Sequence, residues 1–205
     1  MPSTTRPYRG VSAQERTAGR RARLVAAGLD LLGTVGWEQT TMTAVCAHAK
    51  LTERYFYEHF NGRDELLRAV VDQIADEARA TIAAALADAP SDPAATAAAM
   101  ISAFVVFVTD DPRKGRAALV ESAAADPLRR RRHELLREFA HLLVVKTHDL
   151  FGAHAWTPPR DEINAMLFTG GLAEVLTGWL NHEITASPAD IIAAATDQFL
   201  ATARR

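Results

Sequence analysis

Residues 53–60 carry the side chains with the greatest capacity for specific polar contacts. This segment, Glu-Arg-Tyr-Phe-Tyr-Glu-His-Phe, combines a guanidinium, two phenols and an imidazole with two carboxylates. In a helix, Phe56 and Phe60 lie four residues apart on one face and can be buried together, while Arg54 and His59 point elsewhere. Such a short helix offers hydrogen-bond donors and a bidentate arginine to base edges, which suits recognition of a DNA major groove.

Catalytic and metal-binding patterns are absent from the sequence. It contains no phosphate-binding glycine loop, no Gly-x-Ser-x-Gly elbow, no His-Glu-x-x-His pair and no dinucleotide-binding glycine pattern. Glu138 and His141 form the only Glu-x-x-His pair, whereas a di-iron bundle needs two such pairs and further Glu ligands. Cys46 is the only cysteine, which excludes an internal disulfide or a thiolate cluster. We therefore expect no enzyme activity, no cofactor and no metal site.

Two short helices joined by a tight turn must position this segment. Thr41 is expected to begin the first helix, whose apolar face includes Cys46, and Lys50 lies in the turn. Thr52 is expected to begin the second helix, because a threonine hydroxyl can accept a hydrogen bond from a free amide at a helix start. The spacing therefore predicts a helix-turn-helix over residues 41–60.

A longer helix is predicted ahead of this pair. Ser12 and Glu15 have the spacing of a capping box, in which each side chain accepts from the other residue's amide. Apolar residues then recur with helical spacing over residues 24–35, and Gly36 is placed to end the helix. We assign residues 12–67 to one three-helix domain.

Charge is unevenly distributed along the chain. Residues 1–63 hold nine Lys or Arg and five Asp or Glu, whereas residues 64–205 hold 14 and 20. A basic N-terminal part on an acidic remainder is typical of a protein that contacts phosphate, although chance scatter over solvated helices gives the same count. Residues 1–11 are polar and contain two prolines, so we expect a flexible arm.

Residues 68–205 are predicted to form a helical body. Asp-Pro and Ser-Pro pairs recur because Asp or Ser caps a helix and Pro fits its first turn. The expected helices cover about 93–109, 112–124, 127–152, 160–183 and 188–204.

We interpret the arginine run at 129–132 as a solvated face with intrahelical pairs to Glu134 and Glu138. No apolar run reaches the roughly 18 residues of a membrane span, so no membrane association is expected.

The last two predicted helices bear on assembly. Residues 163–180 are apolar on nearly every side, and Gly170-Gly171 would allow close approach of another helix. The final helix continues the apolar pattern. We expect a homodimer through an isologous four-helix contact, with an ordinary internal core as the alternative.

The N-terminal pattern resembles the helix-turn-helix signature of TetR/AcrR-type transcriptional regulators over about residues 20–70. The residues that carry the resemblance are Arg23-Leu24, Gly36-Trp37, Thr40-Thr41, Val45-Cys46, Ala49, Leu51-Thr52, Phe56-Tyr57, His59-Phe60 and Arg63-Asp64-Glu65-Leu66-Leu67. Two positions depart from the family pattern: Lys50 replaces the usual turn glycine, and Cys46 replaces the usual alanine. If the turn needs a positive φ, Lys50 carries strain that glycine would avoid.

The resemblance implies three kinds of DNA contact. Phosphate contacts at helix starts are expected from Thr41 and Thr52. Base-edge contacts are expected from Glu53, Arg54 and Tyr55. Contacts that clamp the DNA backbone are expected from Tyr57, His59 and Arg63.

The resemblance also implies a small-molecule pocket in the body. Six residues are candidates to line it: Phe104, Phe107, His141, His148, Phe168 and Trp179. Each residue type is more often part of a simple core, and the sequence does not choose between the two. An apolar pocket with few polar groups would take a small apolar or amphipathic effector. Glu121 could supply a charge for a cationic ligand, but we interpret it as a surface acid.

We therefore expect an all-α protein with an N-terminal three-helix DNA-binding domain and a C-terminal helical bundle for dimerisation and ligand binding. Its expected function is sequence-specific transcriptional regulation, as a cytoplasmic repressor that a small molecule releases from a double-stranded DNA operator. The alternative is an all-helical protein-interaction module or enzyme without sequence-specific DNA binding.

Overall fold

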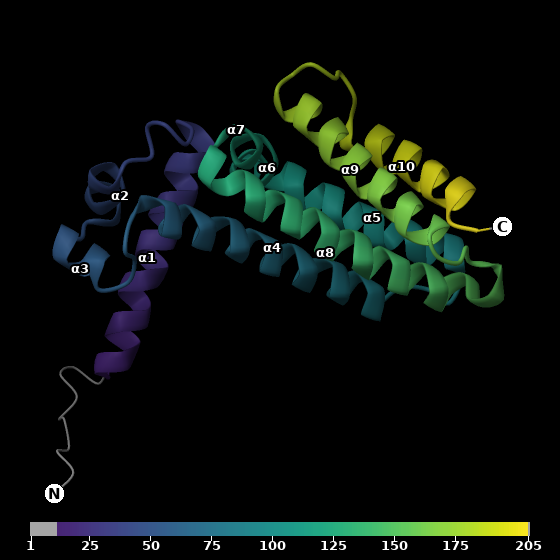
Figure 1. Ribbon diagram of the computed structural model, residues 1–205, viewed down its shortest axis with the longest axis horizontal. Helices are drawn as coiled ribbons and strands as arrows, with labels where there is room; N and C mark the ends of the chain where they lie inside the picture. The colour runs from purple at the N-terminus through teal and green to yellow at the C-terminus, as the bar shows by residue number, and fades with distance from the viewer. Residues whose placement is uncertain (1–11, 205) are drawn as a thin grey trace, which may run out of the picture.

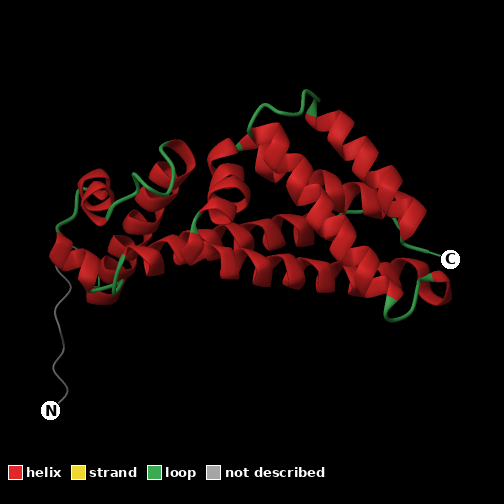
Figure 2. Ribbon diagram, turned by 45° about the horizontal axis from the view of Figure 1, so that its top comes forward, coloured by secondary structure: helices red, strands yellow, loops and turns green. Residues whose placement is uncertain are grey.

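The computed structural model describes residues 12–204, and every regular element among them is helical (Figures 1 and 2). The helical segments are α1 (Ala13–Thr34), α2 (Met42–Ala49), α3 (Glu53–Tyr57), α4 (Arg63–Ala87), α5 (Pro93–Asp110), α6 (Pro112–Gly115), η1 (Arg116–Glu121), α7 (Ser122–Ala124), α8 (Asp126–Phe151), η2 (Gly152–His154), α9 (Arg160–Leu180) and α10 (Pro188–Thr202). The all-α fold class is confirmed. The arm expected at residues 1–11 lies outside the described residues.

The predicted boundaries of α1 are confirmed by its caps. The Ser12 hydroxyl accepts from the Glu15 amide at 3.1 Å, and the Glu15 carboxylate accepts from the Ser12 amide at 2.6 Å. Hydrogen bonding to Ser12 also lowers the pKa of Glu15. At the other end, Gly36 has a φ of 84°, which glycine adopts without the penalty that a Cβ would bring. The helix packs its buried Leu24 and Leu32 against the rest of the domain.

Helix α4 belongs to both parts of the molecule. Its first turns bury Leu66, Leu67 and Val70 in the N-terminal core, and the same helix then runs beside α8 into the body (Figure 1). The expected domain boundary between residues 67 and 68 therefore falls inside one continuous helix. A rigid helix shared by two parts can carry a displacement from one to the other.

Four long helices build the body around α4. In it, α10 packs on α5, and α8 packs on α9 (Figure 1). By length and composition, α5 and α9 could each cross a membrane, which the sequence analysis did not anticipate. Here both helices are part of the bundle, and α9 includes the buried Asp161, whose carboxylate lies 3.0 Å from His148 Nε2. A carboxylate paired in this way fits a protein bundle better than hydrocarbon.

The segment expected as one helix over residues 112–124 contains a π-helical stretch. Helix α6 widens into η1, which buries Ala117 and Leu119, before α7 closes the segment. Single π-helical turns are rare and are often found at functional sites. Here η1 lies between the N-terminal domain and the body, with contacts to α1, α4 and α9.

Glu121, at the end of η1, corrects the interpretation of this residue as a surface acid. Its side chain is only 12% exposed, and it pairs with Arg116 at 3.7 Å. Its Oε2 accepts from the backbone amide of Trp37 at 2.9 Å, across 84 residues of sequence. Nearby, the Gly33 backbone packs so closely on Arg113 that an added Cβ would lie 2.6 Å from the Arg113 carbonyl oxygen. The two parts are therefore joined by a polar and a steric contact.

Glu121→Ala is expected to lower the free energy of unfolding by about 1.5–3 kcal/mol, because it removes a charge-assisted hydrogen bond and leaves the Trp37 amide without its partner. Glu121→Gln is the matched control, since its amide oxygen can still accept from Trp37, and it should cost less. Urea denaturation measures both. Equal unfolding midpoints for Glu121→Ala and the native protein would contradict the role assigned to this contact.

Candidate nucleic-acid interface and body cavity

The first helix of the pair is capped as predicted. The Thr41 hydroxyl accepts from the Ala44 amide at 3.1 Å, so Thr41 is the N-cap of α2. Thr52 occupies the N-cap position of α3, but its side chain makes no capping hydrogen bond. The exposed hydroxyl of Thr52 is thus not used in capping, whereas that of Thr41 already serves the helix.

The turn has the backbone conformation for which Lys50 is poorly suited. Lys50 adopts φ 52° and ψ 46°, in the left-handed region. Arg23 of α1 donates to the carbonyl oxygens of Ala49 at 2.5 Å and of Lys50 at 3.3 Å. The guanidinium of Arg23 thereby holds the turn against α1, a role that the sequence analysis did not assign.

Helix α3 is anchored by two aromatic rings. Phe56 and Phe60 are buried with ring centroids 5.8 Å apart, so the predicted shared face is confirmed. On the outer side, the Arg54 side chain is 87% exposed, with its Nε 3.8 Å from Glu58. Such a weak surface pair leaves the guanidinium available to another partner.

The remaining polar residues of α3 differ in their availability. Glu53 and Tyr57 are exposed. Tyr55 is 36% exposed, and its ring centroid lies 4.7 Å from the guanidinium carbon of Arg20 in α1. His59 is half-buried, and its Nε2 is buried without a hydrogen-bond partner among the described residues. Because Nε2 is buried, only the other ring nitrogen of His59 is left for a phosphate contact, so His59 is a weaker candidate for DNA contact than its neighbours.

Arg63 lies at the start of α4, where it packs on Trp37. Its guanidinium carbon is 5.2 Å from the centroid of the Trp37 ring, and its Nη1 donates to the Trp37 carbonyl at 3.4 Å. Gly62 is the N-cap of α4. The same Trp37 that Arg63 contacts donates its amide to Glu121, so the proposed backbone-contacting arginine is connected to η1.

Cys46 is part of the domain core. Its side chain is buried, and burial raises the pKa of the thiol, an effect to which the charge of Glu53 adds. A raised pKa keeps the sulfur protonated and unreactive at neutral pH. Cys46 is therefore a structural residue of the domain core.

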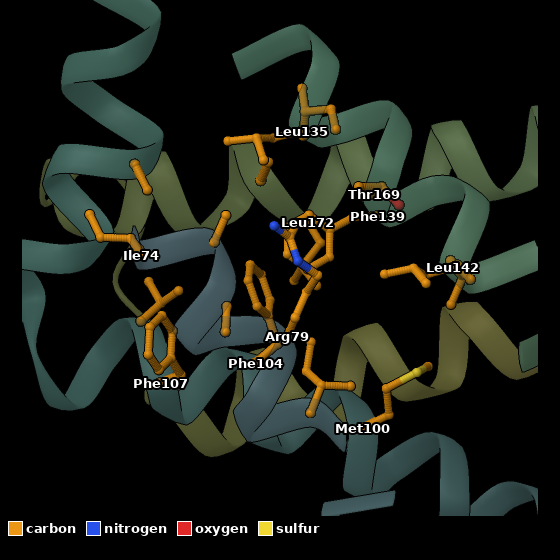
Figure 3. Close-up of a pocket in the computed structure, with 18 of the residues that line it drawn as sticks. Ile74, Arg79, Met100, Phe104, Phe107, Leu135, Phe139, Leu142, Thr169 and Leu172 are labelled. Carbon is orange, nitrogen blue, oxygen red and sulfur yellow. The ribbon is translucent and has the colours of Figure 1, made fainter. Parts of the chain in front are cut away.

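The body encloses an apolar cavity of about 380 Å³ among α4, α5, α6, η1, α8 and α9. Phe104 and Phe107 lie on its wall (Figure 3), and Phe168 also lines it. The other three predicted lining residues are elsewhere. His141 is exposed on α8, His148 pairs with Asp161, and the Trp179 indole donates to the Ala186 carbonyl at 2.9 Å. Of the six predicted residues, only the three phenylalanines therefore line this cavity.

Comparison with known proteins identifies the N-terminal domain. Residues 24–70 match the family model of bacterial regulatory proteins of the tetR family. These residues run from the middle of α1 through α2 and α3 into α4. No curated protein sequence matches this chain.

Solved structures share the whole fold. The fatty acid degradation regulator FadR from Bacillus halodurans superimposes with a TM-score of 0.75 at 14% identity, over 88% of this chain and 94% of that one. A putative transcriptional regulator from Pseudomonas aeruginosa PAO1 gives 0.74 at 18% identity, over 93% and 95%. A transcriptional regulator from Rhodococcus sp. Rha1 gives 0.66 at 21% identity, over 89% and 95%. At these identities the likeness establishes the fold.

Lys50→Gly is expected to raise the free energy of unfolding by about 0.5–1 kcal/mol. Glycine removes a left-handed penalty of about 1–2 kcal/mol but adds conformational entropy to the unfolded chain. Lys50→Ala, which removes the same side chain without relieving the backbone, is the control and should not stabilise. Urea unfolding midpoints decide, and a glycine variant no more stable than the alanine variant would contradict this account of the turn.

Arg54→Ala is expected to weaken binding to a preferred duplex by about 1–3 kcal/mol and to relax base preference at one position per half-site, because a bidentate contact is lost. The matched control is Arg130→Ala. Arg130 is also highly exposed and is also paired with a glutamate four residues later, but it lies on α8. Competition among base-substituted duplexes measures the effect. An unchanged preference profile in Arg54→Ala would remove this residue from base recognition.

Proposed function

Because residues 24–70 form the DNA-binding domain of a tetR-family transcriptional regulator, we propose that this protein is a sequence-specific repressor that a small molecule in the body cavity releases from DNA. The observation that carries the proposal is the geometry of α3. Its aromatic face is buried, and its opposite face presents the largely exposed Arg54 on a domain with excess positive charge. The proposed site of action is the cytoplasm.

The exposed residues of the helix-turn-helix divide into two groups. Arg54 is the principal base contact in this proposal, with Glu53 and Tyr55 beside it at base edges. Thr52 and Tyr57 contact the DNA backbone. We also assign backbone contacts to Thr41 and Arg63, through helix starts whose free amides favour phosphate, and a secondary one to His59.

A duplex-binding measurement tests the function. The protein is used to select a preferred sequence from a random duplex pool, and that sequence is compared with its scrambled version at two salt concentrations. We expect affinity for both to fall as salt rises, because phosphate contacts release counterions, and the preference for the selected duplex to persist. Equal binding to both duplexes, lost together at the higher salt, would leave only a basic surface and refute specific regulation.

A physical route connects the cavity to the DNA-binding domain. Ala118 and Leu119 of η1 line the cavity, and the same segment ends at Glu121, which accepts from the Trp37 amide. Trp37 in turn packs on Arg63 at the start of α4. We propose that a ligand acts by shifting η1, and it can do so only if it binds the non-DNA-binding arrangement more tightly.

We propose that the active form is a homodimer joined through α8 and α9. Large apolar side chains are exposed on both helices: Leu142, Val145, Ile163, Met166, Leu167 and Val175. The final helix was also expected in this contact. Instead, α10 buries Ile191 and Phe199 and packs on α5, so α8 takes its place in the proposed interface. A dimer of this kind must hold its two α3 helices about 34 Å apart, or a multiple of that, to reach successive major grooves.

Leu167→Glu is expected to weaken dimerisation by on the order of 3 kcal/mol, because it would bury an unpaired charge in the interface. Leu167 is 67% exposed in the single chain. Val106→Glu, an equivalent change at an exposed apolar position of α5, is the control and should leave the dimer intact. Sedimentation equilibrium measures both, and a Leu167→Glu protein that dimerises as tightly as the control would place the interface elsewhere.

A further inference from the structure

The shape of the body cavity restricts what can fill it. Its lining on α4 runs from Val71 to Leu86, and its lining on α8 runs from Arg132 to Lys146. At 1.5 Å per residue, each stretch is about 20 Å long. A volume of about 380 Å³ drawn out over such a length makes a narrow channel along the helix axes. This shape suits an extended chain better than a compact ring system.

Most of the cavity wall is hydrocarbon. Figure 3 shows Phe104, Phe107, Phe139, Leu135 and Leu172 around the space. Thr169 is the only uncharged polar residue in the lining. An apolar ligand surface placed here is removed from water without leaving hydrogen-bonding groups unpaired.

The charged residues of the wall are all of one sign. Arg79, Lys114, Arg132 and Lys146 line the cavity, and no Asp or Glu does so. Their acidic partners lie outside the lining, and they are Asp76 and Glu138, Glu77, Glu174 and Asp149, respectively. Figure 3 shows Arg79 extending among the apolar side chains. Each basic group has an acidic partner, but those partners lie outside the lining, so the only charged residues of the lining are basic, which favours an anionic over a cationic group on the ligand.

Arg132 has hydrogen-bonding capacity that the protein does not use. Its side chain is 12% exposed, and its Nη2 contacts Glu174 at 2.7 Å, yet its Nε is buried without a partner among the described residues. A buried donor left unpaired in this way calls for a ligand or water. This differs from the solvated face expected for the arginine run. Arg132 is the first residue of α8 in the lining, and the adjacent Arg131 pairs at 2.6 Å with Asp72, next to Val71, where the lining on α4 begins. Arg132 therefore lies at the end of the channel nearest the DNA-binding domain.

We propose that the cavity binds a linear amphipathic anion, a hydrocarbon chain that ends in a carboxylate. The carboxylate accepts from Arg132 at the domain-facing end of the channel, and the chain extends between α4 and α8 past Phe104 and Phe139. Arg132 shares this cavity with Ala118 and Leu119 of η1, so a ligand held there contacts the same wall. The proposal identifies the chemical class of the effector in the proposed function, but the binding step can be tested without DNA.

The test compares three probes of equal chain length: dodecanoate, dodecanol and dodecyltrimethylammonium. Isothermal titration calorimetry with the native dimer, below the concentration at which the probes aggregate, measures each dissociation constant. We expect dodecanoate to bind at least about tenfold more tightly than dodecanol, because a charge-assisted hydrogen bond is added, and the cation to bind most weakly. Dodecanol binding as tightly as dodecanoate, or tighter binding of the cation, would overturn the proposal.

Two variants locate the head group. Arg132→Gln should lose the preference for dodecanoate over dodecanol while binding dodecanol as before, and its fold should survive because the Glu174 left behind is 68% exposed. Arg130→Gln, the same change at a solvent-exposed position two residues earlier, should keep the preference. A purely structural role for Arg132 would weaken both probes alike, and an unchanged preference in Arg132→Gln would exclude it as the anion site.

The titrations, combined with the duplex-binding measurement repeated in the presence of dodecanoate, separate this inference from the proposed function. Dodecanoate that binds as predicted but leaves duplex affinity unchanged supports the anion site and counts against ligand-controlled repression. Absence of dodecanoate binding in a protein that still binds its selected duplex specifically overturns the anion site alone.

Discussion

The hydrogen bond from the Trp37 amide to Glu121 connects the two parts of the molecule, beside the continuous helix α4 that they share. It joins the loop after α1 to the end of η1, and a salt bridge between Arg113 and Asp30 reinforces the same junction. On the N-terminal side, Trp37 supports Arg63 and the start of α4. On the body side, η1 forms part of the cavity wall. A change at this junction therefore affects both the start of α4 in the DNA-binding domain and the wall of the cavity.

Local features of the fold were predictable because short-range rules determine them. The capping box of Ser12 and Glu15, the cap at Thr41 and the shared face of Phe56 and Phe60 follow from residues three or four apart. The sequence raised a positive φ at Lys50 only as a condition, from the glycine usual at that turn in the family, and the structure has a φ of 52° there. These rules position the candidate DNA-binding helix without any long-range information.

Long-range contacts account for what the sequence did not reveal. Glu121 has no local pattern that distinguishes it from a surface acid, since its partner lies 84 residues away. The same is true of Arg132, which reaches Glu174 of α9, and of His148, which pairs with Asp161. The π-helical stretch at η1 was not predicted from the sequence, which was interpreted as one helix over residues 112–124. Of the six residues predicted to line a pocket, the three phenylalanines line the cavity and the other three lie elsewhere.

Both the cavity and the interface bear on one variable, the separation of the two α3 helices in a dimer. Electron–electron double resonance can follow this separation after spin labelling of an Ala26→Cys variant in a Cys46→Ser background, since Ala26 is exposed on α1 of the same domain and is assigned no contact with DNA. With the selected duplex bound, we predict a narrow distribution consistent with recognition helices about 34 Å apart, or a multiple of that. Adding dodecanoate should shift or broaden it as the duplex dissociates. A distribution that stays unchanged while dodecanoate is bound and the duplex is lost would contradict control of DNA binding through the junction at Glu121.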